Sequence, residues 1–175
     1  TNDYLNMRIN STSLTYTEGY NEYLVLDCDY AYEGTMDGIT MQFIARGGAS
    51  AWATAQELRH ISGLTAGKFA HLTAVYDYTN NRTYFFVNGE MVNYNGADYV
   101  TNGALNASTY PQYKNEGKVL TVSELRIGSN SNSTFYLDNV YVRYQKSNNT
   151  QDNTLATAIE NKTLRAWSDN IYTSH

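Results

Sequence analysis

The sequence predicts an all-β protein, an antiparallel β-sandwich of the jelly-roll type. Apolar and polar residues alternate from the start of the chain to about residue 145, and this two-residue period is typical of strands with one buried face. Turn-forming stretches such as EGTMDG, RGGAS and SNSNS separate the alternating runs at short intervals. No helical period lies between them, so a parallel α/β fold with crossover helices is excluded.

The clearest strand is expected at residues 22–32, EYLVLDCDYAY. Its alternation puts Leu24, Leu26, Cys28, Tyr30 and Tyr32 on one face, and Tyr23, Asp27 and Asp29 on the other. We expect Cys28 to be a buried structural thiol, because the flanking acids raise the pKa of a thiol. The same pattern recurs at residues 38–45, 69–78, 82–89, 118–128 and 134–144.

We expect the sandwich to occupy residues 1–146, and a polar linker with a C-terminal segment to occupy residues 147–175. The break is the polar run SNNTQDN at 147–153. The following TLATAIENKTLRAWSDN fits either a short amphipathic helix, with Leu155, Ile159 and Trp167 inward, or a strand that returns to the sheet. This segment either docks on the sandwich or leads to a neighbouring module.

Residues 93–117 form the least regular part of the sandwich sequence. They show no clear period and carry several tyrosines. We expect a long loop here, and loops of this length often carry function.

Composition excludes several partners. The 12 Lys and Arg residues against 17 Asp and Glu residues give a net charge of −5, which leaves no basic patch for nucleic acid. No apolar run approaches the roughly 20 residues that span a bilayer, so no membrane insertion is expected. A single cysteine excludes a disulfide scaffold. The chain lacks an initiating methionine and a signal peptide, which indicates a piece of a longer protein.

The surface is expected to be polar with little charge. Tyrosine is abundant, at 17 residues, while charged residues make up only 17% of the chain. A surface made polar by Tyr, Asn, Ser and Thr is common in extracellular β-proteins and suits neutral ligands. We therefore expect a secreted or cell-surface location.

Residues 67–92, GKFAHLTAVYDYTNNRTYFFVNGEMV, resemble the central hairpin of laminin-G-like, concanavalin A-like lectin domains. In that family a G-x-W-x-H strand runs into V-x-Y-D, and a second strand ends in Y-V-N-G. Phe69 stands where the family usually has Trp and is expected to keep an aromatic plug. The local reason for V-N-G is that Asn88 and Gly89 supply the positive φ angles of a tight primed turn.

A second segment, LRIGSNSNSTFYLDNVYVRY at 125–144, resembles the L-R-I-G segment and the final strand of the same family. The two segments together span about residues 67–144. The resemblance implies a concanavalin A-like sandwich that acts as a carbohydrate-binding module, with a polysaccharide or glycan as its partner and covalently linked neighbouring modules.

The sequence lacks the motifs of enzymes on this fold. Glycosidases of the same sandwich carry paired carboxylates as E-x-D-x-x-E, and this motif is absent. Polysaccharide lyases use a His and Tyr pair, but His60, His71 and His175 show no such pattern and no zinc spacing. We therefore expect a non-catalytic module. A structural or adhesin spacer that binds protein, and a lyase-like or glycosidase-like domain, remain the alternatives.

Sugar contacts are expected from aromatic side chains and from acids. Aromatic faces cover the C–H surfaces of sugars, and Trp52, Tyr94, Tyr110 and Tyr113 all stand in segments predicted to be loops. The alternative for Trp52 is a place in the core. A separate pair, Asp27 and Asp29, would lie ~7 Å apart on one strand face. These acids either contact sugar hydroxyls or a metal, or form a solvated face.

Asp138 is the candidate metal ligand. Alternation puts it on the same side as Val140 and Val142, which we expect to be buried, and a buried carboxylate needs a partner. The resemblance implies a structural calcium ion (Ca2+) held by this acid, with oxygens from early acids such as Asp3, Glu18 or Asp37. The alternatives are a backbone cap or an ion pair with Arg126 or Arg143.

Overall fold

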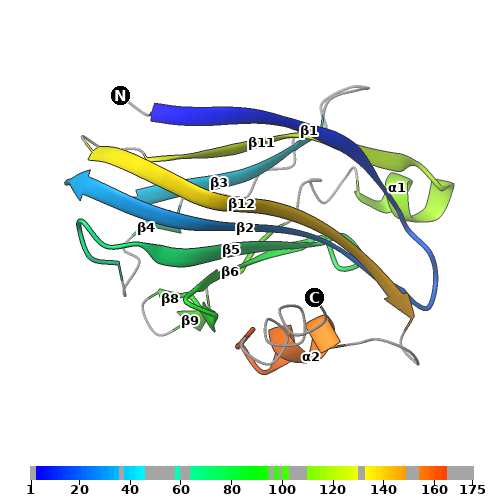
Figure 1. Cartoon of the computed structure of the whole chain (residues 1–175). Helices are drawn as coiled ribbons and strands as arrows, with labels where there is room; N and C mark the ends of the chain where they lie inside the picture. Colours follow the sequence, from blue (N-terminus) through cyan, green and yellow to red (C-terminus); the bar gives the residue numbers. More distant parts are fainter. Residues whose placement is uncertain are drawn as a thin grey trace.

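The computed structural model describes residues 3–35, 38–45, 58–59, 64–94, 97–98, 100–102, 110–129, 133–148 and 154–164 (Figure 1). The strands are β1 Asp3–Thr15, β2 Tyr20–Gly34, β3 Gly38–Ala45, β4 Leu58–Arg59, β5 Ala70–Asp77, β6 Arg82–Val87, β7 Glu90–Met91, β8 Asn93–Tyr94, β9 Ala97–Asp98, β10 Val100–Asn102, β11 Val119–Ser129 and β12 Ser133–Asn148. The helices are α1 Tyr110–Glu116 and α2 Thr154–Glu160.

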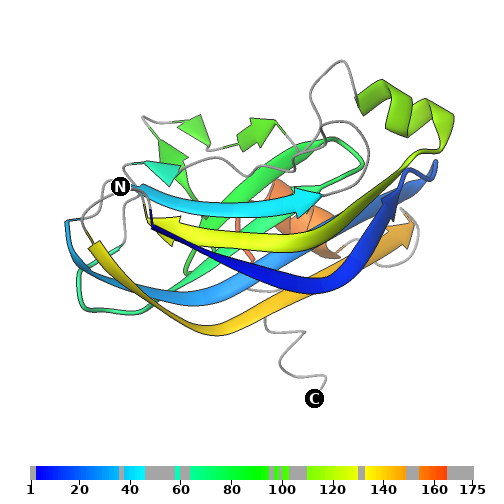
Figure 2. The same ribbon diagram turned by 90° about the horizontal axis from the view of Figure 1, so that it is seen from above.

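The strands form two antiparallel sheets that face each other. The smaller sheet has the order β1-β11-β3-β4, and the larger has the order β10-β6-β5-β2-β12 with β7 paired to β6. Strands β8 and β9 pair separately. Figure 2 looks down on the smaller sheet, with the larger sheet behind it. This arrangement confirms the predicted all-β antiparallel sandwich.

The core lies between the sheets, and the two-residue period explains its composition. The predicted inner face of β2 is confirmed, since Leu24, Leu26, Cys28 and Tyr30 are fully buried in the main core cluster. Burial raises the pKa of the Cys28 thiol to about 12, with the charges of Asp27 and Asp29 adding to the effect. The thiol is therefore protonated and inert near neutral pH.

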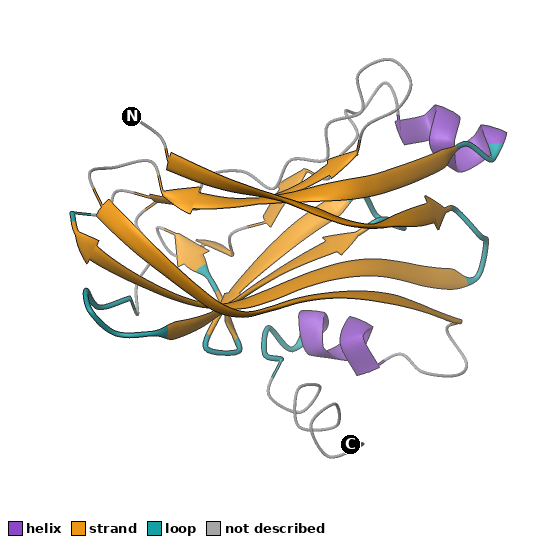
Figure 3. Cartoon of the chain, turned by 45° about the horizontal axis from the view of Figure 1, so that its top comes forward, coloured by secondary structure: helices purple, strands orange, loops and turns teal. Residues whose placement is uncertain are grey.

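A second apolar cluster lies on the outer side of the larger sheet. Tyr23, Val25, Val75 and Phe86 form it on the sheet, and α2 with the residues after it covers them through Leu155, Ala158 and Leu164. Figure 3 shows α2 against this outer side and α1 at one end of the sandwich. The segment takes the helical form of the two that were predicted, and after the helix Thr163 makes an isolated bridge to Glu90. Trp167 lies outside the described residues.

The turn after β6 has the predicted geometry. Asn88 and Gly89 have φ angles of 50° and 80°, and across them Phe86 pairs with Met91 and Val87 with Glu90. Asn88 also joins the turn to β5: its Oδ1 accepts the His71 N–H at 2.9 Å, and its own N–H donates to the His71 carbonyl at 2.7 Å. The V-N-G sequence thus fixes the backbone at His71.

Two expectations about local structure were wrong. Residues 110–116 form α1, where a continuous loop was predicted. Phe69 is not a core plug, since 59% of it is exposed. The next residue, Ala70, belongs to the core, so the alternation of side chains turns Phe69 to the outer face. No helix in the described part of the chain is long and apolar enough to cross a membrane.

Candidate binding site

The outer face of the larger sheet changes from apolar to polar along β2. Beyond Tyr23 and Val25, which α2 covers, the next outward residues are Asp27 and Asp29. The strand register sets Asp27 opposite Thr73 of β5 and Tyr141 of β12, and sets Asp29 opposite His71 and Asp138. A polar cluster is thereby placed directly beside the apolar surface under α2.

His71 joins the two acids. Its Nε2 lies 2.9 Å from Oδ1 of Asp27, and its Nδ1 lies 3.0 Å from Oδ1 of Asp29. Both ring nitrogens face carboxylate oxygens, which can only accept, so both nitrogens donate and the ring is an imidazolium. The three residues, Asp27, His71 and Asp29, are called the acid–histidine cluster below.

The acids raise the pKa of His71 to about 9. The hydrogen bond to Asp27 is the largest cause; burial opposes it, and the hydrogen bond to Asp29 and the charges of both acids add to it. Partial burial also raises the pKa of Asp29, but hydrogen bonds from Asn139 and His71 and the charge of His71 outweigh that effect and lower it. At neutral pH the cluster holds one positive and two negative charges, for a net charge of −1.

The stability of the sandwich is expected to fall as pH rises from 6.5 to about 9. A histidine whose pKa is raised on folding stabilises the protein fully below its unfolded pKa of 6.5 and loses that contribution as pH passes its folded pKa of about 9. Because a third of the side chain is exposed, solvent screening limits the loss to about 1 kcal/mol. Urea unfolding on either side of this range measures it. His71→Gln should show a flat profile there, and an equal slope in this variant would contradict the assignment.

Asn139 reaches the cluster through a β-bulge. The register between β12 and β2 shifts between Asp138 and Tyr141, and Asn139 has a φ of 48°, a left-handed conformation that asparagine tolerates better than most residues. Its Nδ2 donates to Oδ2 of Asp29 at 2.8 Å. Strained backbone of this kind is often found at functional sites.

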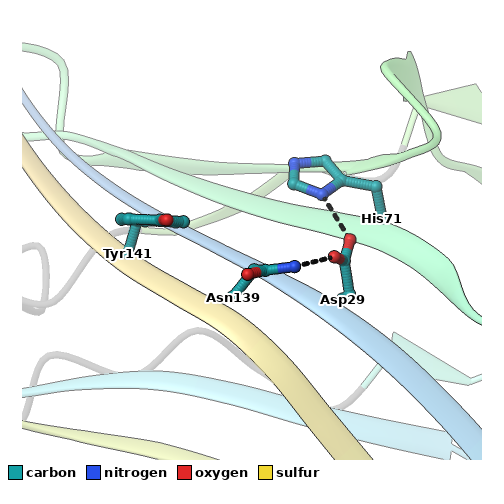
Figure 4. Close-up of a pocket in the computed structure, with 4 residues that line it drawn as sticks. All are labelled: Asp29, His71, Asn139 and Tyr141. Carbon is teal, nitrogen blue, oxygen red and sulfur yellow. Dashed lines mark hydrogen bonds and ion pairs between the residues drawn. The ribbon is translucent and has the colours of Figure 1, made fainter.

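A pocket of about 250 Å³ opens at this place (Figure 4). Asp29, His71, Asn139 and Tyr141 line it. Figure 4 shows the Asn139 amide between the Asp29 carboxylate and the ring of Tyr141. Tyr141 is 54% exposed. The pocket therefore combines an open aromatic ring with a carboxylate, an amide and an imidazolium.

The structure unites only some of the predicted site residues. Asp29 lines the pocket, and Asp27 lies behind it, bonded to His71 and Thr73. Tyr110 and Tyr113 pack against the core instead; the Tyr110 hydroxyl donates to the carbonyl of Thr79. The side chain of Tyr94 and all of Trp52 lie outside the described residues.

Asp138 does not occupy the predicted face. Its side chain is exposed, while Val140 and Val142 pack against the core. The bulge at Asn139 is the reason, because one extra residue reverses the alternation between Asp138 and Val140. Oδ1 of Asp138 accepts the N–H of Asn139 at 2.8 Å. Within the described ranges, no group of three or more His, Cys, Asp and Glu side chains is placed to hold a metal ion. Asp37, a candidate partner of Asp138, lies outside these ranges, and the calcium site stays a prediction.

Sequence reasoning missed His71, Asn139 and Tyr141 as partners of Asp29. One signal was available: His71 falls on the opposite face of its strand from Leu72 and Ala74, which are predicted to be buried, so it is expected to face outward, as Asp27 and Asp29 do. What the sequence does not show is that these strands are neighbours.

No protein-family model matches the chain, and no curated protein matches its sequence. Among solved structures, a sialidase is similar at 11% identity and a TM-score of 0.40, over 82% of this chain and 16% of that one. A tetrameric galectin from the ball sponge Cinachyrella sp. is similar at 10% identity and a TM-score of 0.39, over 81% of this chain and 100% of that one. The function is therefore inferred from the geometry of the site itself.

Proposed function

We propose that the chain is a non-catalytic carbohydrate-binding module of a secreted or cell-surface modular protein. It binds a neutral sugar of a polysaccharide or glycan in the pocket of Asp29, His71, Asn139 and Tyr141. The observation that carries the proposal is the exposed Tyr141 ring beside a carboxylate and an amide that are already held in place. Rigid aromatic and polar groups of this kind bind with little loss of side-chain entropy.

Each group in the pocket has a role that suits a sugar. The Tyr141 ring offers an apolar face to C–H groups. An ionised carboxylate has about four lone-pair sites, so Asp29 can accept from a sugar hydroxyl while it holds His71 and Asn139. The amide of Asn139 can both donate and accept. The cluster's net negative charge favours a neutral sugar over a uronate.

The same contacts support binding over catalysis. A lyase needs a base with a free lone pair, but both ring nitrogens of His71 face carboxylates, and its pKa is raised to about 9. A glycosidase needs one carboxylic acid whose pKa is raised, whereas the pKa of Asp29 is lowered. The acid–histidine cluster therefore suits a fixed binding surface.

Tyr141→Ala is expected to abolish or strongly weaken sugar binding. Truncating a central aromatic contact should raise the Kd about tenfold or more. Native gels that contain mixed-linkage β-glucan, xyloglucan, galactomannan or arabinoxylan, with polygalacturonate as the acidic comparison, measure this as loss of retardation. The same gels run with calcium and with chelator test whether the ion affects binding.

Tyr20→Ala is the matched control. Tyr20, like Tyr141, is an exposed tyrosine of the larger sheet. It lies at the start of β2, nine residues from Asp29 and about 30 Å away along the strand. The Tyr20→Ala variant should be retarded like the wild type. Retardation of both variants equal to the wild type would place the sugar elsewhere, and no retardation of the wild type by any polymer would favour a spacer or protein-binding role.

A further inference from the structure

Two exposed aromatic side chains stand close to the pocket without lining it. Phe69 is 59% exposed and Tyr136 is 44% exposed, and both are among the large hydrophobic side chains that the described part of the chain leaves open to solvent. Neither has a role in the core, and neither belongs to the surface that α2 covers. Both lie beside the same part of β2.

Both residues flank Ala31 of β2. Tyr136 of β12 pairs with Ala31 directly. On the other side Ala70 pairs with Tyr30, and the Gly67 N–H donates to the Tyr32 carbonyl at 2.8 Å, so Phe69 is held beside Ala31. Neighbouring strands lie about 4.8 Å apart, which puts the two aromatic residues roughly 10 Å from each other.

Ala31 lies between them and carries only a methyl group. It is 4% exposed, so a ligand at this place would contact the two aromatic side chains and not Ala31. The hydroxyl of Tyr136 donates to Oε2 of Glu33 at 3.2 Å, which restrains that ring. The result is a pair of exposed aromatic side chains that flank β2.

The aromatic pair continues the pocket in one direction. Ala31 lies two residues beyond Asp29 on β2, which is about 7 Å along the strand. The apolar surface covered by α2 lies on the opposite side of Asp29, at Tyr23 and Val25. A ligand held in the pocket can therefore extend along β2 toward Ala31, whereas α2 covers the face in the other direction.

We propose that Phe69 and Tyr136 form a second subsite, which binds the next sugar of a linear neutral oligosaccharide running along β2. This inference rests on the proposed carbohydrate-binding function and adds the form of the ligand: a chain of at least two sugars. A sugar ring presents apolar C–H groups, and the two exposed aromatic side chains can cover them. The adjoining carboxylate and amide of the pocket bind the hydroxyls of its neighbour.

Titration calorimetry with oligosaccharides of increasing length tests the second subsite. The probes are gluco-, manno-, xylo- and chito-oligosaccharides, from the monosaccharide to the hexasaccharide. For the series that binds, wild-type affinity should rise with length. Phe69→Ala and Tyr136→Ala should each weaken the longer sugars about five- to tenfold and leave the monosaccharide unchanged. Tyr141→Ala should weaken every length.

The outcomes separate the two proposals. If Phe69→Ala and Tyr136→Ala bind all lengths like the wild type while Tyr141→Ala does not, the second subsite is wrong and the proposed function stands. If no probe binds to the wild type, both are wrong. Ring-proton NMR shifts of Phe69 in the wild type, with the monosaccharide and the longest sugar, answer the same question without a variant; shifts that are equal for both sugars would contradict the subsite.

Discussion

Leu155→Ala is expected to lower the free energy of unfolding by about 3 kcal/mol. Leu155 is fully buried, and it packs in the cluster formed by α2 and the outer face of the larger sheet. Truncation removes apolar contacts and leaves a cavity against Val25 and Phe86, which lie on regular strands that cannot close over it. Urea unfolding followed by tyrosine fluorescence measures the loss.

Thr157→Ala provides the control for Leu155→Ala. Thr157 lies on the same helix but is exposed, so its replacement should change stability by less than about 0.5 kcal/mol. If the two variants were equally stable, α2 would not be an integral part of the sandwich. A loss confined to Leu155→Ala would place the functional boundary of the domain after α2, beyond the residue 146 expected from the sequence.

Glu22→Ala is expected to cost a similar amount, about 3 kcal/mol, for a different reason. Glu22 is only 2% exposed, and its Oε1 accepts the Thr15 N–H at 3.1 Å and the Tyr144 hydroxyl at 2.7 Å. Thr15 ends β1 of the smaller sheet, while Tyr144 belongs to β12 of the larger. Alanine leaves both donors without this acceptor, and hydrogen bonds to charged groups are worth roughly 1.5–3 kcal/mol each. The removal of a desolvated carboxylate offsets part of the loss.

Three further variants isolate this effect. Glu18→Ala removes the same charge from an exposed position in the turn before β2, and it should be nearly neutral. Tyr144→Phe removes one of the two bonds to the carboxylate and should cost about 1.5 kcal/mol. Glu22→Gln keeps an acceptor oxygen and should fall between Glu18→Ala and Glu22→Ala. If Glu22→Ala proved as stable as Glu18→Ala in urea unfolding, the carboxylate would not hold the sheets together.

The faces of the strands could be predicted because alternation is a local property. Leu24, Leu26 and Cys28 point inward as expected, since each strand residue's direction follows from its neighbours. The bulge at Asn139 breaks this rule, and apart from the asparagine itself the local sequence has no feature that predicts a bulge. For this reason the predicted face of Asp138 was wrong. Helix α1 was missed because seven residues are too few to show a period, although Pro111 in its first turn was a usable signal.

The candidate site could be predicted only in part, because it depends on which strands are neighbours. Asp27 and Asp29 were chosen as contacts from a single strand. Their partners His71 and Tyr141 lie more than 40 residues further along the chain, and they meet the acids because β2 lies between β5 and β12. That strand order follows from the packing of the whole sandwich, so it cannot be predicted from one segment of the sequence at a time.

The bulge in β12 also bears on edge-to-edge association between copies of the molecule. β12 is the last strand of the larger sheet, and β1, which is the first strand of the smaller one, has its own irregularity between Arg8 and Thr12. Long, regular edge strands are templates for aggregation, because another chain can pair along their open N–H and C=O groups. Each of these edges is interrupted near its middle, which limits such pairing to short stretches. The bulge that places Asn139 in the proposed sugar pocket therefore also limits edge-to-edge association.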